Sequence, residues 1–412
     1  METKRVFNFD LQVNKLNAVF KNKINTEITA DKAYNAVFSI AQNAGGASFE
    51  IIALEKDFVK FGDGIVSALK KAGVEYSVLL ISVTDLNFTK PQKIFGLKSS
   101  EVIILGGKDL ISYALFYASY QTKNIHAVLT EPYVEGLLGN TVTVPDGGFV
   151  KVITVSKLKT LILDKSIINK ADANSISYAY IKCISKLVAL IDYKLALLIG
   201  SKVLNKEYYD RSRLAVTLVS IINSFSNYVE VLAYASLLNA EVLYSSNVLL
   251  DGGQRHVAHA IELQLPAEDK GNVAYVAFDR VVKLYHAFFT NDLTDVVSVA
   301  NYNGDISLIS KISGKDLSYF YDKLKIPSAK RKDMLSKLIS LTRNGFLKET
   351  TVALTSLADI KSNYCKFKKQ KQNVINFKYA HLKNGVELAS YLSSETTVLT
   401  LLRDFGVLNL LK

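Results

Sequence analysis

The chain has 412 residues, more than one average domain, and 49% of them are hydrophobic. This combination excludes a largely disordered polypeptide and predicts two packed domains. Lysine and arginine together number 50 against 38 aspartate and glutamate residues, giving a net charge of +12 and a pI near 9.3. The positive charge permits attraction to nucleic acid, anionic lipid or phosphorylated ligands, but it is spread along the chain.

The densest basic run is Lys366-Phe-Lys-Lys-Gln-Lys371, with Tyr364 and Phe367 beside it. A run of this kind is more often a solvated loop than a nucleic-acid site, for which clustered charge would be stronger support. We therefore expect no binding to a specific nucleic acid.

The chain has two cysteines, Cys183 and Cys365, far apart and not at the spacing of metal ligands. This usage excludes a disulfide framework and indicates a reducing compartment. The N-terminus lacks the continuous apolar core of a signal peptide, and the apolar stretch 184–200 is interrupted by Lys186, Asp192 and Lys194. The sequence predicts a soluble intracellular protein, in the cytoplasm or an organelle matrix, without membrane insertion.

In chain order, the first elements expected are a helix at 30–44, a strand at 49–54 that enters a loop at 55–57, a helix at 65–71, a strand at 76–83, a strand at 101–105 and a helix at 110–121. Strands that alternate with helices indicate a parallel sheet.

After these come a strand at 125–129, a glycine-containing loop at 131–140, a hairpin around 145–148 and a strand at 160–164. Helical periodicity then prevails at 173–200, 208–224, 226–240, 254–264, 271–289 and in segments from 315 onward. We expect a Rossmann-like α/β domain over 1–168 and an all-helical domain over 169–412.

A pair of glycines, Gly106 and Gly107, separates the strand at 101–105 from the next helix, whose first turn contains Asp109. Glycines between a parallel strand and a helix N-terminus allow a backbone to approach a pyrophosphate. They also serve as an ordinary tight turn, and both interpretations stay open.

The stretch 251–262 contains His256 and His259, which are three positions apart and can share one face of a helix. Two imidazoles do not make a metal site without a third ligand. Farther along, Lys270 precedes a glycine at a position where a metal enzyme would need a ligand. An ammonium group has no lone pair and repels a divalent cation.

The order of these pieces resembles the dehydroquinate synthase-like superfamily over residues 47–390, and within it 3-dehydroquinate synthase most closely. The superfamily also includes other sugar-phosphate cyclases, glycerol-1-phosphate dehydrogenase and iron-type alcohol dehydrogenases. The resemblance implies a Rossmann-like domain followed by a helical domain. It also implies chemistry that begins when bound NAD oxidises a metal-coordinated alcohol.

The family's nucleotide-binding motifs are degenerate in this chain. Its GGGxxGD loop resembles residues 104–113, where Gly106, Gly107 and Asp109 match. In the next loop the family's Asp falls on Leu137 and its Lys near Thr143, and the substrate-binding Lys of the KAEVV segment falls on Asn239. We expect NAD to bind weakly or not at all.

The family's metal motif is also degenerate. His259-Ala-Ile-Glu262 matches the end of LNxGHxxxHAIE, but the first histidine of that motif falls on Arg255 and the later one on Lys270. The third ligand, an acid, should lie in 175–182, which contains none. A shift of one residue that made His256 a ligand would require a compressed helix. The resemblance therefore implies that the metal site is lost.

These losses favour a non-catalytic member of the superfamily, kept as a binding, scaffold or assembly subunit, as a homodimer or part of a larger assembly, with no cofactor. The alternative is an active enzyme that uses NAD and zinc, either a sugar-phosphate cyclase of the 3-dehydroquinate synthase type, which is a lyase, or an NAD-dependent polyol dehydrogenase.

If Arg255 and Lys270 both faced the former metal cavity, their charges would need compensation. We expect Glu262 or Asp251 to supply it, and we expect Lys270→Ala to destabilise the fold by roughly 3 kcal/mol if the pair is buried. Alternatively, the two cations together could hold a phosphate or a carboxylate.

Overall fold

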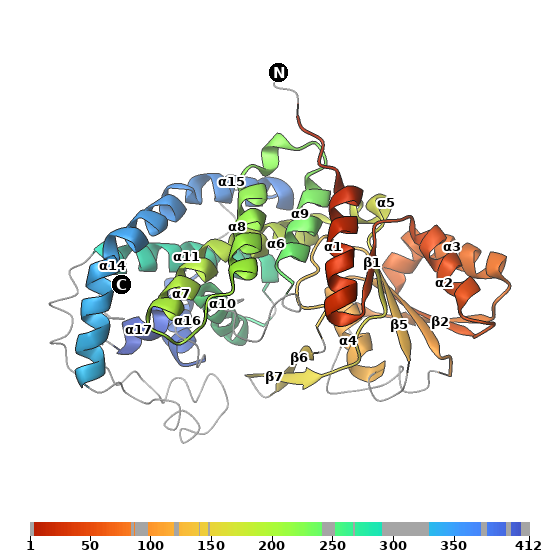
Figure 1. Cartoon of the computed structure of the whole chain (residues 1–412), viewed down its shortest axis with the longest axis horizontal. Coiled ribbons are helices and arrows are strands. Elements are labelled where there is room, and N and C mark those ends of the chain that lie inside the picture. Colours follow the sequence, from red (N-terminus) through yellow and green to blue (C-terminus); the bar gives the residue numbers. More distant parts are fainter. Residues whose placement is uncertain are drawn as a thin grey trace. The chain divides into compact units, whose positions relative to one another are not determined.

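The computed structural model (Figure 1) describes residues 4–83, 86, 98–118, 123–139, 141–146, 149–240, 252–266, 268–290, 329–371, 377–392 and 397–404. The chain divides into two compact units. Unit 1 holds the described residues of 1–146, 150–179 and 217–243, and unit 2 holds those of 147–149, 180–216 and 244–412. The sequence analysis expected one boundary between residues 168 and 169. The observed units differ from this, because the chain passes between them more than once.

Unit 1 is built on a six-stranded sheet with the order β1-β8-β5-β4-β2-β3. The strands are β1 (Glu27–Thr29), β2 (Phe49–Leu54), β3 (Tyr76–Ile81), β4 (Glu101–Gly106), β5 (Asn124–Leu129) and β8 (Thr160–Ile162). All the pairs are parallel, as the sequence predicted. Strand β4 is buried along its whole length, so its sequence is continuously apolar after Glu101.

The helices of the α/β part are α2 (Ala33–Asn43), α3 (Glu55–Ala72) and α4 (Lys108–Ala118). Buried residues of α2 and α3 form one core cluster with residues of β2, β4, β5 and β8. The prediction of a loop at 55–57 is wrong, because α3 begins at Glu55 directly after β2. Glu55 and Asp57 lie in its first turn, where acidic side chains are favoured by the helix dipole. Strands β6 (Thr141–Asp146) and β7 (Phe149–Thr154) form a two-stranded sheet, and the turn of the expected hairpin lies outside the described residues.

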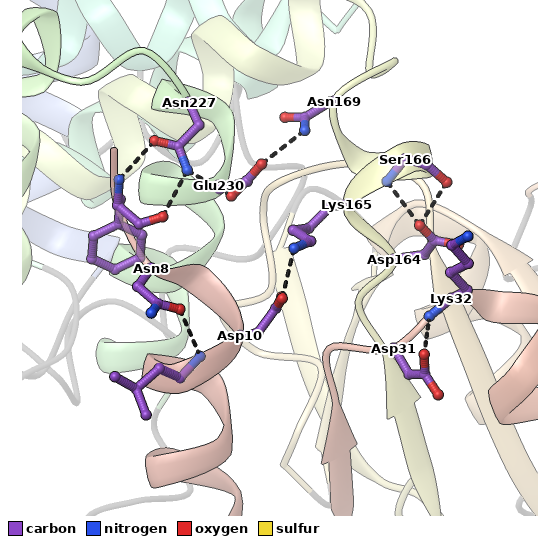
Figure 2. Close-up of polar contacts among 12 residues, drawn as sticks. Asn8, Asp10, Asp31, Lys32, Asp164, Lys165, Ser166, Asn169, Asn227 and Glu230 are labelled. Atoms are coloured by element: carbon purple, nitrogen blue, oxygen red, sulfur yellow. Dashed lines mark hydrogen bonds and ion pairs between the residues drawn. The ribbon is translucent and has the colours of Figure 1, made fainter. Parts of the chain in front are cut away.

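Unit 1 also contains α1 (Phe9–Ile24), which the sequence analysis did not anticipate, and α5 (Lys165–Ile168) and α9 (Tyr228–Leu238). Figure 2 shows how polar contacts connect these segments. Asn227 accepts a hydrogen bond from the amide of Phe7 at 2.9 Å and donates one to the Phe7 carbonyl at 2.8 Å. Lys165 pairs with Asp10 at 2.6 Å. The chain start is thereby joined to segments more than 150 positions away.

Asp164, just after β8, accepts hydrogen bonds at the N-termini of two helices. Its carboxylate binds the amide of Ala33 at 2.8 Å at the start of α2, and the amide of Ser166 at 2.7 Å in α5. Both helices thus gain an acceptor for first-turn N–H groups that have no partner within the helix. Figure 2 shows the two bonds that Ser166 donates to Asp164.

The remaining helices are α6 (Ala173–Ile184), α7 (Lys186–Leu198), α8 (Lys206–Ser220), α10 (Gly253–Gln264), α11 (Lys270–Thr290), α14 (Ala329–Thr355), α15 (Leu357–Lys368), α16 (Tyr379–Leu392) and α17 (Val398–Asp404). In unit 2, α10 packs on α7, α11 and α16, and α14 packs on α7, α11 and α15. The helical second half expected from the sequence is confirmed in the described residues, while 315–328, where further segments were expected to begin, lies outside them. In the part of the chain that the structure describes, no helix is both long enough and apolar enough to cross a membrane.

The basic run at 366–371 is not simply a solvated loop, because its first part is the last turn of α15. Tyr364 and Phe367 are buried. Lys368 pairs with Asp269 and keeps only 7% of its side chain exposed. The two rings beside the run are therefore core residues and do not offer faces on which bases could stack.

Candidate functional site

The strand order of unit 1 reverses beside β4, since the chain runs from β2 to the edge strand β3 and then returns to β4 on the other side of β2. In parallel α/β sheets, ligands bind outside the carboxyl ends of the strands at such a switch point. Gly106 and Gly107 lie there, between β4 and the N-terminus of α4. Topology thus identifies the glycine turn as the candidate nucleotide position.

The carboxyl group of Glu131 lies against this turn. The amide of Lys108, the first residue of α4, donates a hydrogen bond to Glu131 Oε1 at 2.5 Å. A Cβ atom built on Gly107 would lie 2.6 Å from the Glu131 Cδ atom, so a larger residue at 107 would require this carboxyl group to shift. The glycine turn therefore contacts a carboxyl group of the chain itself.

Other carboxyl groups surround this position. Burial raises the pKa of Glu131 to about 7, the hydrogen bond from Lys108 opposes the shift, and the charges of Asp109 and Asp172 add to it. Asp57 in α3 is buried, and burial raises its pKa as well. The switch point is therefore acidic, although the chain as a whole is basic.

The segment that carries Glu131 is fixed to the rest of unit 1. Thr130 donates its amide to the Gly106 carbonyl at 3.1 Å. The amides of Val134 and Glu135 both donate to the hydroxyl of Ser236 in α9, at 2.8 and 3.0 Å. The backbone on both sides of Glu131 is thus held in position.

Two further positions of this region, Leu137 and Asn239, are buried. Leu137, where the resemblance would require an Asp, is an apolar core residue. A pyrophosphate at the switch point would have to displace the Glu131 carboxyl group and would meet further acids. The residues present therefore do not fit the pyrophosphate of NAD. Asp109 keeps its place in the first turn of α4, but it is exposed there.

In unit 2, one face of α10 carries Arg255, His259 and Glu262. Successive members are four and three positions apart, which aligns them along the helix. Arg255 Nη1 lies 3.7 Å from Glu262 Oε1, and His259 Nδ1 lies 3.7 Å from Glu262 Oε2. Burial alone would raise the pKa of Glu262, but His259 and the charges of Arg255 and Lys270 lower it below its ordinary value. The expectation that Glu262 compensates Arg255 agrees with this contact, while Asp251 lies outside the described residues.

This face does not fit a catalytic divalent metal. Within the described ranges, no group of three or more His, Cys, Asp or Glu side chains could hold one. Arg255 is beside the two histidines in sequence and binds the nearest carboxylate, which would otherwise be the best anionic ligand. His256 is partly buried in the same helix. Helix α6, which includes residues 175–182, has no acid to add.

The expectation that Lys270 faces a buried cavity is wrong. Lys270 begins α11 and its side chain is exposed, because a helix start after a short connection is open to solvent. Its charge acts on Glu262 through solvent-accessible surroundings, where screening is strong.

We therefore expect Lys270→Ala to change the free energy of unfolding by no more than about 0.5 kcal/mol, since exposed ion pairs contribute little. Urea unfolding followed by circular dichroism would measure the change. Arg255→Ala is the matched comparison. It should lower the free energy of unfolding by more, because Arg255 pairs with Glu262 and is partly buried. A loss near 3 kcal/mol for Lys270→Ala would show that its side chain is enclosed after all.

A buried carboxylate on α7 explains why glycines stand at the start of α10. Asp192 has no exposed surface. It accepts hydrogen bonds from the Gly253 amide at 2.7 Å, the Tyr285 hydroxyl at 2.8 Å and the Val398 amide at 2.8 Å. A Cβ on Gly252 would lie 2.6 Å from Asp192 Oδ2, and one on Gly253 would lie 2.2 Å from the Tyr285 hydroxyl. These glycines therefore allow Asp192 and Tyr285 to approach the start of α10.

Comparison with solved structures gives high-probability matches over most of the chain. Sulfoacetaldehyde reductase from Bifidobacterium kashiwanohense, in complex with NAD+, matches at a TM-score of 0.58 and 11% identity, covering 94% of this chain and 97% of that one. NADH-dependent butanol dehydrogenase A from Thermotoga maritima matches at 0.52 and 13%, covering 89% and 97%. An iron-containing alcohol dehydrogenase from the same organism matches at 0.51 and 10%, covering 89% and 98%.

The chain has the fold of an iron-containing alcohol dehydrogenase. At these identities the likeness extends to the fold alone. The resemblance to the dehydroquinate synthase-like superfamily is thus confirmed as a fold, and the narrower likeness to 3-dehydroquinate synthase is not supported. No protein-family model matches the sequence, and no curated protein matches it either.

Two residues that shape this alcohol dehydrogenase fold were missed by sequence reasoning. In the sequence, Glu131 is the second residue after a predicted strand and has no other distinguishing feature. Asp192 is noticeable only as a charged residue that interrupts an apolar stretch. A charged residue inside an otherwise apolar helix is a signal in itself, since unpaired burial is costly and a partner must exist. The position of Glu131 has no comparable signal, because acids are common in loops.

Proposed function

We propose that this chain uses the alcohol dehydrogenase fold without metal-dependent hydride transfer, as a non-catalytic binding, scaffold or assembly subunit. The supporting observation is the contact between Arg255 and Glu262 on α10. A cation paired with the carboxylate nearest to His259 takes the place that a divalent ion would need. The metal-dependent route for oxidising an alcohol with a nicotinamide needs a Lewis acid to stabilise the alkoxide.

A second candidate is an NAD-dependent alcohol or polyol dehydrogenase, and the comparisons favour it over the first. The three matched structures described above are named as dehydrogenases or reductases, and one contains NAD+. One contact also favours it, because Nε2 of His259 is buried and makes no hydrogen bond among the described residues. An imidazole nitrogen in that state is a possible metal ligand.

Metal content and hydride transfer separate the two candidates. The purified chain would be equilibrated anaerobically with Fe2+ or with Zn2+, desalted and analysed for bound metal. NADH oxidation with butanal or sulfoacetaldehyde would be followed at the same time. We expect less than about one tenth of a metal ion per chain and no oxidation above background, because no group of three or more possible ligands is found among the described residues.

The double variant Arg255→His/Lys270→His should also stay metal-free, because Lys270 is exposed and α6 offers no acid. His259→Ala is the matched control. One tightly bound ion per wild-type chain that chelator removes and that His259→Ala loses would establish the second candidate in place of the first.

A further inference from the structure

The N-terminus of α4 has the geometry of an anion site. It follows β4 at the switch point of a parallel sheet, and Gly107 directly precedes it. The first-turn N–H groups of this 11-residue helix lack partners within the helix. What lies against this N-terminus is the carboxyl group of Glu131, bound to the Lys108 amide at 2.5 Å and packed on Gly107. We propose that the Glu131 carboxyl group is a built-in occupant that closes a phosphate-binding position, which would otherwise take a pyrophosphate.

The geometry around Gly107 supports this proposal. The space that any Cβ on Gly107 would need contains three atoms of the Glu131 carboxyl group, at 2.6 to 2.8 Å. A phosphate group that approached the same backbone would overlap with these atoms. The carboxyl group and a phosphate therefore exclude each other.

The internal carboxyl group also has an entropic advantage over a free anion. Thr130 is bound to Gly106 by its amide and to Asp57 by its hydroxyl, and Val134 is bound to Ser236. These contacts keep the backbone of Glu131 near α4, so its carboxyl group reaches the helix N-terminus without a bimolecular encounter. A dissolved anion must additionally lose its translational freedom.

Charges of both signs lie near the Glu131 carboxyl group. Asp109 on α4 and Asp172 before α6 contribute negative charge, and Lys108 contributes positive charge. Removing only the Glu131 carboxyl group makes the position both vacant and less negative. A gain of phosphate binding is therefore the expected result of a single substitution.

The test uses the full chain and inorganic pyrophosphate as the probe. Titration calorimetry at pH 8 would compare wild type, Glu131→Ala and Asp109→Asn. Asp109→Asn removes the same charge from the first turn of α4 but leaves the Glu131 carboxyl group in place. We expect Glu131→Ala to bind pyrophosphate at least tenfold more tightly than wild type, and Asp109→Asn to differ from wild type by less than threefold.

A second variant covers the case that Glu131→Ala does not fold. Glu131→Ser keeps a small acceptor for the Lys108 amide and still vacates most of the position, so it should show the same gain. The proposal is overturned if a folded variant without the carboxyl group binds no better than wild type, if Asp109→Asn gains as much, or if wild type itself binds pyrophosphate tightly. Metal content and hydride transfer do not enter these readouts, so the result is independent of the function proposed above.

Discussion

Asp192→Ala is expected to lower the free energy of unfolding by about 4 kcal/mol, the largest effect that we predict for one substitution. The carboxylate accepts three hydrogen bonds, from Gly253, Tyr285 and Val398. Each bond to a buried charged group contributes about 1.5–3 kcal/mol, and truncation also leaves the donors unsatisfied. The N-termini of α10 and α17 both lose their acceptor.

The measurement is urea unfolding followed by circular dichroism, with two comparison variants. Tyr285→Phe removes one of the three hydrogen bonds and should lower the free energy of unfolding by about 1–2 kcal/mol. Asp279→Asn neutralises a partly exposed acid on α11 that pairs with the exposed Lys283 at 2.7 Å, and it should lower the free energy of unfolding by less than about 0.5 kcal/mol. Equal midpoints for Asp192→Ala and Asp279→Asn would mean that Asp192 does not hold these helices together.

The second large effect concerns Glu131 and pH. Because burial raises its pKa to about 7 from an ordinary value of 4.5, the folded chain binds this proton more tightly than the unfolded chain does. Ionisation therefore destabilises the fold progressively as pH rises from about 4.5 through 7 and reaches its full effect above 7. A shift of this size corresponds to about 3 kcal/mol.

Glu131→Gln keeps an oxygen acceptor for the Lys108 amide and cannot ionise. We expect its stability relative to wild type to be about 3 kcal/mol more favourable at pH 8.5 than at pH 4.5. Urea midpoints of both proteins over this range provide the measurement. Glu55→Gln, at an exposed position in the first turn of α3, is the control, and its stability relative to wild type should change by no more than about 1 kcal/mol over this range. A constant offset between Glu131→Gln and wild type would contradict the raised pKa.

Much of the fold could be predicted because its signals are local. Strands β2, β4 and β5 are short, mostly apolar segments, and the helical second half is periodic. The start of α3 could have been predicted correctly from the acids Glu55 and Asp57, which mark a helix N-terminus. Strand β1, in contrast, has three residues, too few for any period to be visible.

The candidate site could be predicted only where its contacts lie within one helix. Arg255 and Glu262 are seven positions apart on α10, so their common face follows from helix geometry. Asp192 contacts residues 61, 93 and 206 positions away, and no local pattern encodes these separations. Lys270 was placed wrongly because alignment to a motif gives a position in sequence and does not give exposure.

The sheet of unit 1 has a consequence for synthesis on the ribosome. Strand β1 pairs only with β8, and the first amide of α2 binds Asp164, 131 positions later. At about 5–20 residues per second, the first 30 residues would wait about 7–26 seconds for these partners to be made. During that interval Phe9, Val13, Leu16 and Phe20, all buried in the finished protein, would be exposed on the nascent chain. This N-terminal segment is therefore the part of unit 1 that we expect a ribosome-associated chaperone to bind.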